Sequence, residues 1–170
     1  MSNEGLTRGA TIPPFFRAAM TSSLSKKIRP LTREEQAAFP SDVIVPLEAP
    51  FVDPRGSIQP LVDAAMESCV LISSKKGTVR ANHYHQTDWH YCYVLSGAID
   101  YYHRPHDSKE KPVLVRIRTG QMFFTPPLVD HAMHFTEDTV FLTFGRNSRA
   151  QEVYEADVVR IESLLPAGPR

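Results

Sequence analysis

Histidine side chains, which bind metals and transfer protons near neutral pH, are concentrated in one part of this 170-residue chain. All seven lie between positions 83 and 134. His83 and His85 stand two residues apart, a spacing that turns both imidazoles to the same face of a β-strand. His90 begins the next apolar run, and His131 opens a later one. Two paired hairpins could therefore bring four histidines into one cluster.

The segments that must position these histidines have the pattern of short β-strands. From Val43 onward, apolar or alternating runs are separated by Pro, Gly, Asp and Asn, which is typical of strands joined by turns. We predict strands near residues 43–47, 57–61, 69–72, 78–82, 90–95, 98–103, 113–117, 122–125, 131–135 and 140–144. So many strands with almost no helix predict an all-β sandwich or barrel. Residues 155–165 fit a last strand or a short helix equally well.

The residues before the first strand have a different character. Thr32 followed by Glu35 predicts a capping box for one short helix that ends before Pro40. Residues 1–30 show no sustained period and carry mostly basic charges: Arg8, Arg17, Lys26, Lys27 and Arg29 against Glu4. We therefore predict a basic, poorly ordered arm over 1–30 and a single domain over 31–170, since the chain is short for two domains of typical size.

The composition excludes several functional classes. Lys+Arg 19 balances Asp+Glu 19, so no net positive charge attracts nucleic acid or an anionic membrane. No apolar run reaches the ~18 residues of a membrane span, and the N-terminus lacks a secretory pattern. Cys69 and Cys92 do not have the spacing of a metal or redox pair. We expect a cytoplasmic protein with a small-molecule substrate, and a homodimer in which an N-terminal segment or edge strand pairs with the partner.

Two motifs around the histidines resemble those of the cupin superfamily. Its first motif is Gly, five residues, His-x-His, three or four residues, Glu, six residues and Gly. The matching positions are Gly77, His83, His85 and Gly97, with His90 in place of the usual Glu. Its second motif is Gly, five residues, Pro-x-Gly-x-x-His. The matching positions are Gly120, Pro126 and His131, with Leu128 in place of the usual Gly.

This resemblance covers roughly residues 43–146, with the motif core over 77–135, and implies the double-stranded β-helix of cupins, a jelly-roll barrel. It also implies a metal ion in the barrel mouth, held by His83, His85, His90 and His131. Neutral imidazoles suit Fe, Ni, Zn, Cu or Mn and bind Mg or Ca poorly. Asp88 competes with His90 for the fourth position, because the two share strand parity and carboxylates are good ligands. An octahedral ion would keep two positions open for substrate or water.

Two arginines extend the resemblance toward cupins that act on nucleotide sugars, such as the dTDP-4-dehydrorhamnose 3,5-epimerases and the dTDP-sugar ketoisomerases. In those enzymes an Asp-x-Arg-Gly turn precedes the barrel and an Arg lies shortly before a catalytic His. Asp53-Pro-Arg55-Gly56 and Arg80 occupy similar positions here. The resemblance implies that Arg55 and Arg80 bind a diphosphate, for which a planar guanidinium is well suited. The alternative is an Asp-Pro turn and an exposed strand-edge arginine.

Three functions are compatible with these residues. The first is an isomerase or epimerase of a carbohydrate or nucleotide sugar, in which His83 or His85 removes a proton next to a carbonyl. A nitrogen that binds a metal cannot also accept that proton, so metal content separates the possibilities. The second is an Fe(II)-dependent dioxygenase that uses the same ligands. The third is a non-catalytic barrel that binds a sugar or a metal.

Overall fold

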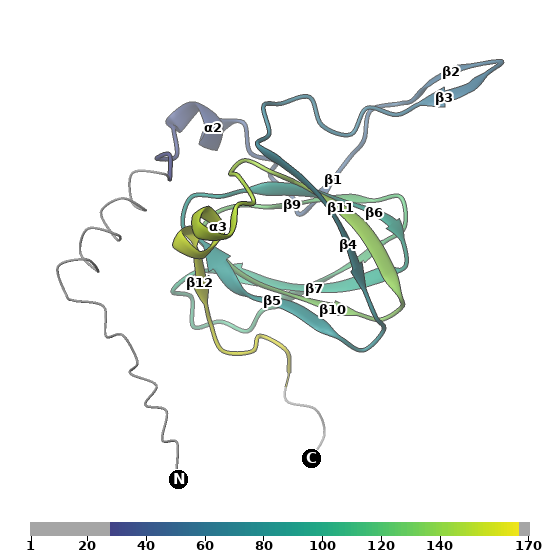
Figure 1. Ribbon diagram of the computed structural model, residues 1–170. Coiled ribbons are helices and arrows are strands. Elements are labelled where there is room, and N and C mark those ends of the chain that lie inside the picture. The colour runs from purple at the N-terminus through teal and green to yellow at the C-terminus, as the bar shows by residue number, and fades with distance from the viewer. Residues whose placement is uncertain (1–27, 167–170) are drawn as a thin grey trace, which may run out of the picture.

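Two five-stranded antiparallel sheets face each other and enclose the interior of a barrel in the computed structural model, which describes residues 28–166 (Figure 1). The first sheet contains, in spatial order, β1 (Ile44–Val45), β9 (Met122–Thr125), β6 (His90–Ser96), β11 (Thr139–Gly145) and β4 (Ser68–Ser74). The second contains β12 (Val158–Arg160), β5 (Val79–His85), β10 (Val129–Phe135), β7 (Ala98–Pro105) and β8 (Val113–Arg118).

Buried and exposed side chains alternate along these strands, because every second residue of a strand points into the apolar interior of the barrel. In β6, Cys92 and Val94 are fully buried, whereas Tyr91 and Tyr93, which alternate with them, are partly exposed. Residues from both sheets form one apolar cluster: Cys92, Val94, Ile99, Tyr101, Ile117, Phe123, Met133, Phe135 and Phe141. The barrel therefore has an apolar core that supports the more polar residues described below.

A glycine of the first motif makes the turn between β6 and β7. Gly97 has a φ of +89°, and a Cβ there would lie 2.5 Å from the backbone oxygen of Asp138. Only glycine fits both the left-handed conformation and this close approach without strain. The motif glycine is thus explained by the geometry of the turn.

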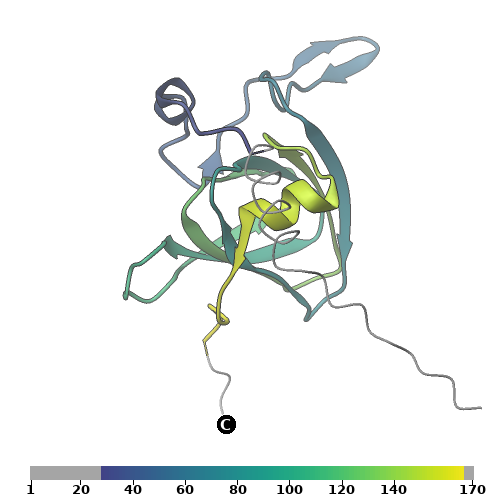
Figure 2. The ribbon, with the colours of Figure 1, turned by 60° about the vertical axis from the view of Figure 1, so that its left-hand side comes forward.

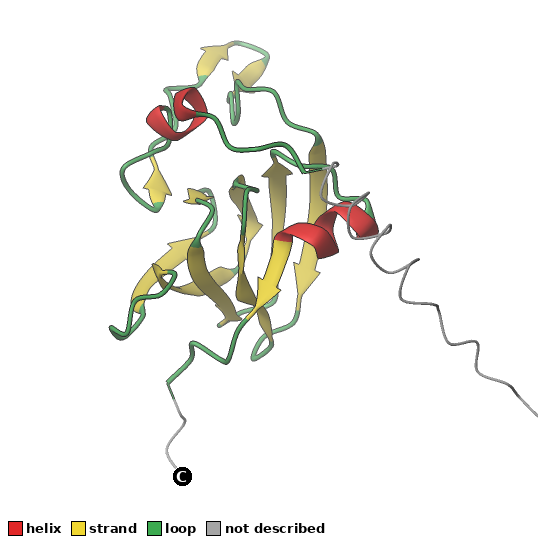
Figure 3. Cartoon of the chain, turned by 90° about the vertical axis from the view of Figure 1, so that its left-hand side faces the viewer, coloured by secondary structure: helices red, strands yellow, loops and turns green. Residues whose placement is uncertain are grey.

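Three further pieces lie outside the two sheets. The hairpin of β2 (Phe51–Asp53) and β3 (Gly56–Ile58) projects away from the barrel (Figure 1). Helix α2 (Arg33–Ala37) is the short helix predicted from Thr32 and Glu35, and both hydrogen bonds of the capping box are present. Helix α3 (Gln151–Asp157) continues directly into β12 (Figure 3) and lies in front of one end of the barrel (Figure 2).

The predicted all-β jelly-roll barrel with a short N-terminal helix is confirmed. The ten predicted strands are present with shifted ends, and the segment left open over 155–165 contains the end of α3 and β12. The prediction missed β2 and ended β5 three residues early. Most of the predicted basic arm lies outside the described residues. Neither helix of the described part is long and apolar enough to span a membrane.

Candidate active site

A cavity of about 140 Å³ lies inside the barrel, at the end that α3 faces. The four histidines of the two motifs line it: His83, His85, His90 and His131. Other polar or charged side chains line it as well: Arg80, Thr143, Arg149 and Tyr154. The cavity therefore combines imidazoles, a phenol and two guanidinium groups above an apolar base.

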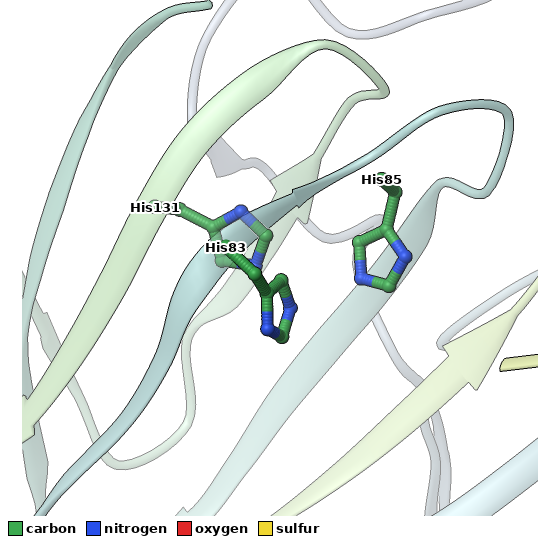
Figure 4. Close-up of side chains that lie close together, drawn as sticks. All are labelled: His83, His85 and His131. Carbon is green, nitrogen blue, oxygen red and sulfur yellow. The ribbon is translucent and has the colours of Figure 1, made fainter. Parts of the chain in front are cut away.

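Three neighbouring strands carry the histidines. His83 and His85 are on β5, His131 is directly opposite His83 on β10, and His90 starts β6 in the facing sheet. The side chains of His83, His85 and His131 lie close together (Figure 4). The ring centroid of His83 lies 4.9 Å from that of His85 and 4.7 Å from that of His131. The ring of His90 lies 5.2 Å from that of His85. The two motifs thus meet in one cluster.

His85 forms a hydrogen bond with a buried carboxylate that the sequence did not reveal. Its Nδ1 lies 2.9 Å from Oδ2 of Asp157 at the end of α3, and both side chains are 2% exposed. The other oxygen of Asp157 accepts hydrogen bonds from the backbone nitrogen and the hydroxyl of Thr87, at 2.7 and 2.8 Å. Burial would raise the pKa of Asp157, but hydrogen bonds from His85 and Thr87 hold it below its usual value.

An ionised Asp157 decides the tautomer of His85. A carboxylate can only accept, so Nδ1 of His85 carries the proton and Nε2 keeps its lone pair. A proton taken up by Nε2 would create an imidazolium next to the Asp157 carboxylate, which stabilises it. This is the arrangement that orients a histidine base in many enzymes.

The other histidines of the cluster are held neutral by burial and by one another. Burial and the neighbouring His131 and His85 lower the pKa of His83 to about 2. Burial and His85 lower the pKa of His131 to about 3, and the same causes lower the pKa of buried His90 well below its usual value. At neutral pH these three rings are therefore poor proton acceptors but good metal ligands and hydrogen-bond partners.

The donor set fits a transition metal. The ligand nitrogens of His83, His85 and His131 lie within 4.8 Å of one another, and a second group with the same spacing joins His85 to Asp88 and His90. A carboxylate hydrogen-bonded to the far nitrogen of His85 is also what metal-binding histidines commonly have. Asp88 accepts a hydrogen bond from the backbone of Asn147 at 2.9 Å, and burial raises its pKa to about 6.

The two predicted substrate-binding arginines lie in different places. Arg80 lines the cavity, where its guanidinium donates to Ser74 Oγ at 2.6 Å and to the backbone oxygen of Ser73 at 3.0 Å. Arg55 is in the turn between β2 and β3 and forms an ion pair with Asp53. Of the two predicted arginines, therefore, Arg80 accompanies the histidines within one chain and Arg55 does not.

Helix α3 and the loop before it supply the site residues that sequence reasoning missed. The ring centroids of Tyr154 and His85 lie 6.1 Å apart. The guanidinium of Arg149 lies over the ring of Tyr154, 3.9 Å from its centroid. Asp157 follows Tyr154 by one helical turn and is 72 residues from His85 in the sequence. No local pattern marks these residues, because only the packing of α3 against the barrel makes them neighbours of the histidines.

No protein-family model and no curated protein sequence matches the chain. Solved structures do. The TDP-quinovose 3,4-ketoisomerase WlaRB from Campylobacter jejuni is 16% identical, with a TM-score of 0.57 over 69% of this chain and 90% of that chain. The dTDP-4-dehydrorhamnose 3,5-epimerase from Sulfolobus tokodaii is 18% identical, with a TM-score of 0.56 over 71% and 78%. The ketoisomerase QdtA from Thermoanaerobacterium thermosaccharolyticum is 19% identical, with a TM-score of 0.54 over 67% and 84%. These similarities confirm the predicted cupin-type fold.

Proposed function

We propose that the protein is a sugar isomerase or epimerase that moves a proton on a carbon next to a carbonyl group. The observation that carries the proposal is the buried hydrogen bond between His85 and Asp157 on the wall of the cavity. It distinguishes His85 from the other three histidines, which burial keeps neutral. His85 is therefore assigned as the base, and His83 as its neutral neighbour.

The reaction requires a base and a way to stabilise negative charge. Nε2 of His85 takes the proton from the carbon, and the electron pair moves onto the carbonyl oxygen to form an enediolate. Asp157 stabilises the resulting imidazolium. In an isomerisation, the same imidazolium gives the proton to the former carbonyl carbon, and the hydroxyl proton of the deprotonated carbon moves to the former carbonyl oxygen, so that this hydroxyl becomes the new carbonyl. In an epimerisation, a second donor delivers a proton to the opposite face of the deprotonated carbon, the carbonyl re-forms, and His85 releases its proton to solvent. The cationic groups of Arg80 and Arg149 favour the negatively charged intermediate.

The substrate class follows from charge and from the similar structures. Arg80 and Arg149 give the cavity a positive mouth without a carboxylate that pairs with either among the described residues. The similar ketoisomerases and epimerases act on TDP-linked sugars, and one of them is described in complex with TDP. A nucleotide-linked keto sugar is therefore the proposed substrate, with its diphosphate near these arginines.

A metal centre is the second candidate, because the donor set fits one. His83, His85 and His131 would hold a divalent transition metal, with His90 or Asp88 completing the set. When bound, such an ion would polarise a substrate carbonyl as a Lewis acid. Nε2 of His85 cannot serve as a ligand and as a base at once. No observation at the site favours the dioxygenase alternative.

The test uses untagged protein and TDP-4-keto-6-deoxyglucose, the sugar present in one QdtA complex. The proposal predicts that the protein incorporates solvent deuterium next to the sugar carbonyl, as NMR detects, and that exhaustive chelation leaves this rate unchanged. His85→Asn should lower the rate by about 10²–10⁴-fold, as expected for the loss of a general base. Loss of the activity on chelation, with recovery on adding metal, would instead support the metal centre.

A matched control is available on the outside of the barrel. His106 forms a similar pair with Asp130, with 2.9 Å between Nδ1 and Oδ1, but it does not line the cavity. His106→Asn should therefore keep the wild-type rate. If it lost as much activity as His85→Asn, the effect could not be assigned to the cavity, and the proposed role of His85 would be wrong.

A further inference from the structure

Strand β5 contains a local distortion directly before the histidines. Ala81 has a φ of 68° and Asn82 a φ of 53°, so two consecutive residues other than glycine occupy the left-handed region. This conformation is unfavourable for residues with a β-carbon, by about 1–2 kcal/mol for most of them, although asparagine tolerates it better. A distortion of this kind persists only where surrounding contacts maintain it, and such sites cluster around functional residues.

The pairing of β5 with β10 shows what the distortion does. Met133 is opposite Arg80 and Ala132 is opposite Ala81, but the next partner, His131, is opposite His83 rather than Asn82. Asn82 is therefore an extra residue, a β-bulge in β5.

The bulge decides which face of the strand the histidines occupy. Facing residues in an antiparallel pair project to the same side of the sheet, and successive residues along one strand project to opposite sides. In an unbroken strand, Arg80 and His83 would point to opposite faces. The inserted residue reverses the alternation, so Arg80, His83 and His85 all line the cavity. Tyr84 between the histidines instead stacks on His106 outside it.

The C-terminal segment after β12 holds the bulge in place. The backbone oxygen of Asn82 accepts a hydrogen bond from the nitrogen of Ile161 at 3.0 Å. Its side-chain Oδ1 accepts one from the nitrogen of Leu164 at 3.1 Å, and Leu164 is buried. Asparagine thus meets two requirements at this position: it tolerates the left-handed conformation, and its side-chain oxygen accepts the hydrogen bond from the backbone nitrogen of Leu164.

We propose that Asn82 is a positioning residue for the histidine cluster. Through the bulge and its hydrogen bond to Leu164, it holds His83 and His85 in the cavity with the orientation that lets His85 meet Asp157. The effect on catalysis rests on the proposed function, whereas the effect on the imidazole rings does not.

The test therefore uses two readouts on Asn82→Ala, which keeps a β-carbon but removes the acceptor for Leu164. Long-range proton–nitrogen NMR of the imidazoles should show changed signals for His83 and His85. The kcat for the keto sugar should fall by about 10²-fold with little change in KM, because small displacements of catalytic groups have effects of this size. Asn82→Asp keeps an acceptor oxygen and should retain most of the wild-type kcat.

Two further variants separate positioning from stability. Asp107 also has a left-handed φ, of 68°, in the exposed loop between β7 and β8. Asp107→Ala should be destabilised similarly but keep the wild-type imidazole signals and kcat. Asn82→Gly relaxes the backbone while removing the hydrogen bond, so it remains useful if Asn82→Ala does not fold, and it should show the same altered signals.

Wild-type imidazole signals in both Asn82→Gly and Asn82→Ala would overturn the proposal, as would equal changes in Asp107→Ala. If the wild-type protein does not turn over a keto sugar, the proposed function fails, and the imidazole spectra alone decide whether Asn82 positions the cluster.

Discussion

At the scale of single residues, the environment of each imidazole separates the four histidines. Their spacing in the two motifs was sufficient to predict that His83, His85, His90 and His131 are neighbours. It could not predict their different chemistry, because that depends on Asp157. This carboxylate is 72 residues from His85 and reaches it only through the packing of α3. A sequence pattern indicates which histidines share a strand face, but not which residue orients one of them.

Asp88 gives a prediction about stability and pH. Burial raises its pKa to about 6 in the folded protein, from 3.8. An acid whose pKa is raised by folding contributes stability that is present below pH 3.8 and is lost as the pH rises through about 6. Asp88→Asn removes this loss, since an amide does not ionise. The free energy of unfolding of Asp88→Asn minus that of wild type should therefore be about 1 kcal/mol larger at pH 8 than at pH 5.

The measurement is chemical denaturation of both proteins at the two pH values in buffer containing a chelator. A difference between variant and wild type that stays the same at pH 5 and pH 8 would show that Asp88 does not titrate in this range in the folded protein.

At the scale of elements, sequence patterns within a few residues predicted local structure, but contacts between residues distant in the sequence could not be predicted. The capping box of Thr32 and Glu35 lies within four residues, and the predicted helix formed with both of its hydrogen bonds. Glu35 also binds the buried guanidinium of Arg146, with 2.6 Å between Oε1 and Nε, a contact across 111 residues that no local pattern reveals. The bulge at Asn82 was missed for a related reason. Its left-handed backbone is imposed by the C-terminal segment rather than by glycine.

The bulge gives a prediction at this scale. Ala81 has a φ of 68°, which glycine adopts without steric cost. Ala81→Gly should therefore raise the free energy of unfolding by about 0.5–1 kcal/mol, in contrast to the usual effect of glycine in a strand. Its cross-strand partner Ala132 is a buried residue without a positive φ. Ala132→Gly should lower stability by a similar or larger amount in the same denaturation experiment. Equal destabilisation by both substitutions would contradict the conformation assigned to Ala81.

At the scale of the whole molecule, the projecting hairpin and one sheet edge expose apolar side chains. The projecting hairpin exposes three apolar side chains: Phe51 60%, Val52 68% and Ile58 64%. Strand β4 lies at the edge of its sheet without a charged residue, and its Leu71 is 61% exposed. An uncharged edge strand and an apolar hairpin are surfaces that proteins usually cover. The sequence motifs predicted the barrel but not the projection of the hairpin, which lies in the long connection between β1 and β4, the two edge strands of the first sheet.

These surfaces sharpen the expectation of a homodimer. A second copy that covers the hairpin or the edge of β4 would bury the exposed apolar groups, and it would also place Arg55 against another chain. Light scattering at micromolar concentration should give the mass of a dimer. Replacing both Val52 and Ile58 by Lys should shift the mass toward a monomer while leaving the barrel folded. A monomer mass for the wild-type protein would refute the expectation.

The central claim is that Asp157 makes His85 a base. Asp157→Asn keeps the size of the side chain but removes the charge that stabilises the imidazolium and selects the tautomer. The decisive measurement is the rate at which this variant incorporates solvent deuterium next to the carbonyl of TDP-4-keto-6-deoxyglucose, compared with wild type and with Asp130→Asn, the same change in the outer His106 pair. The account predicts a loss of about 10²–10⁴-fold for Asp157→Asn and the wild-type rate for Asp130→Asn. A wild-type rate for folded Asp157→Asn would contradict it.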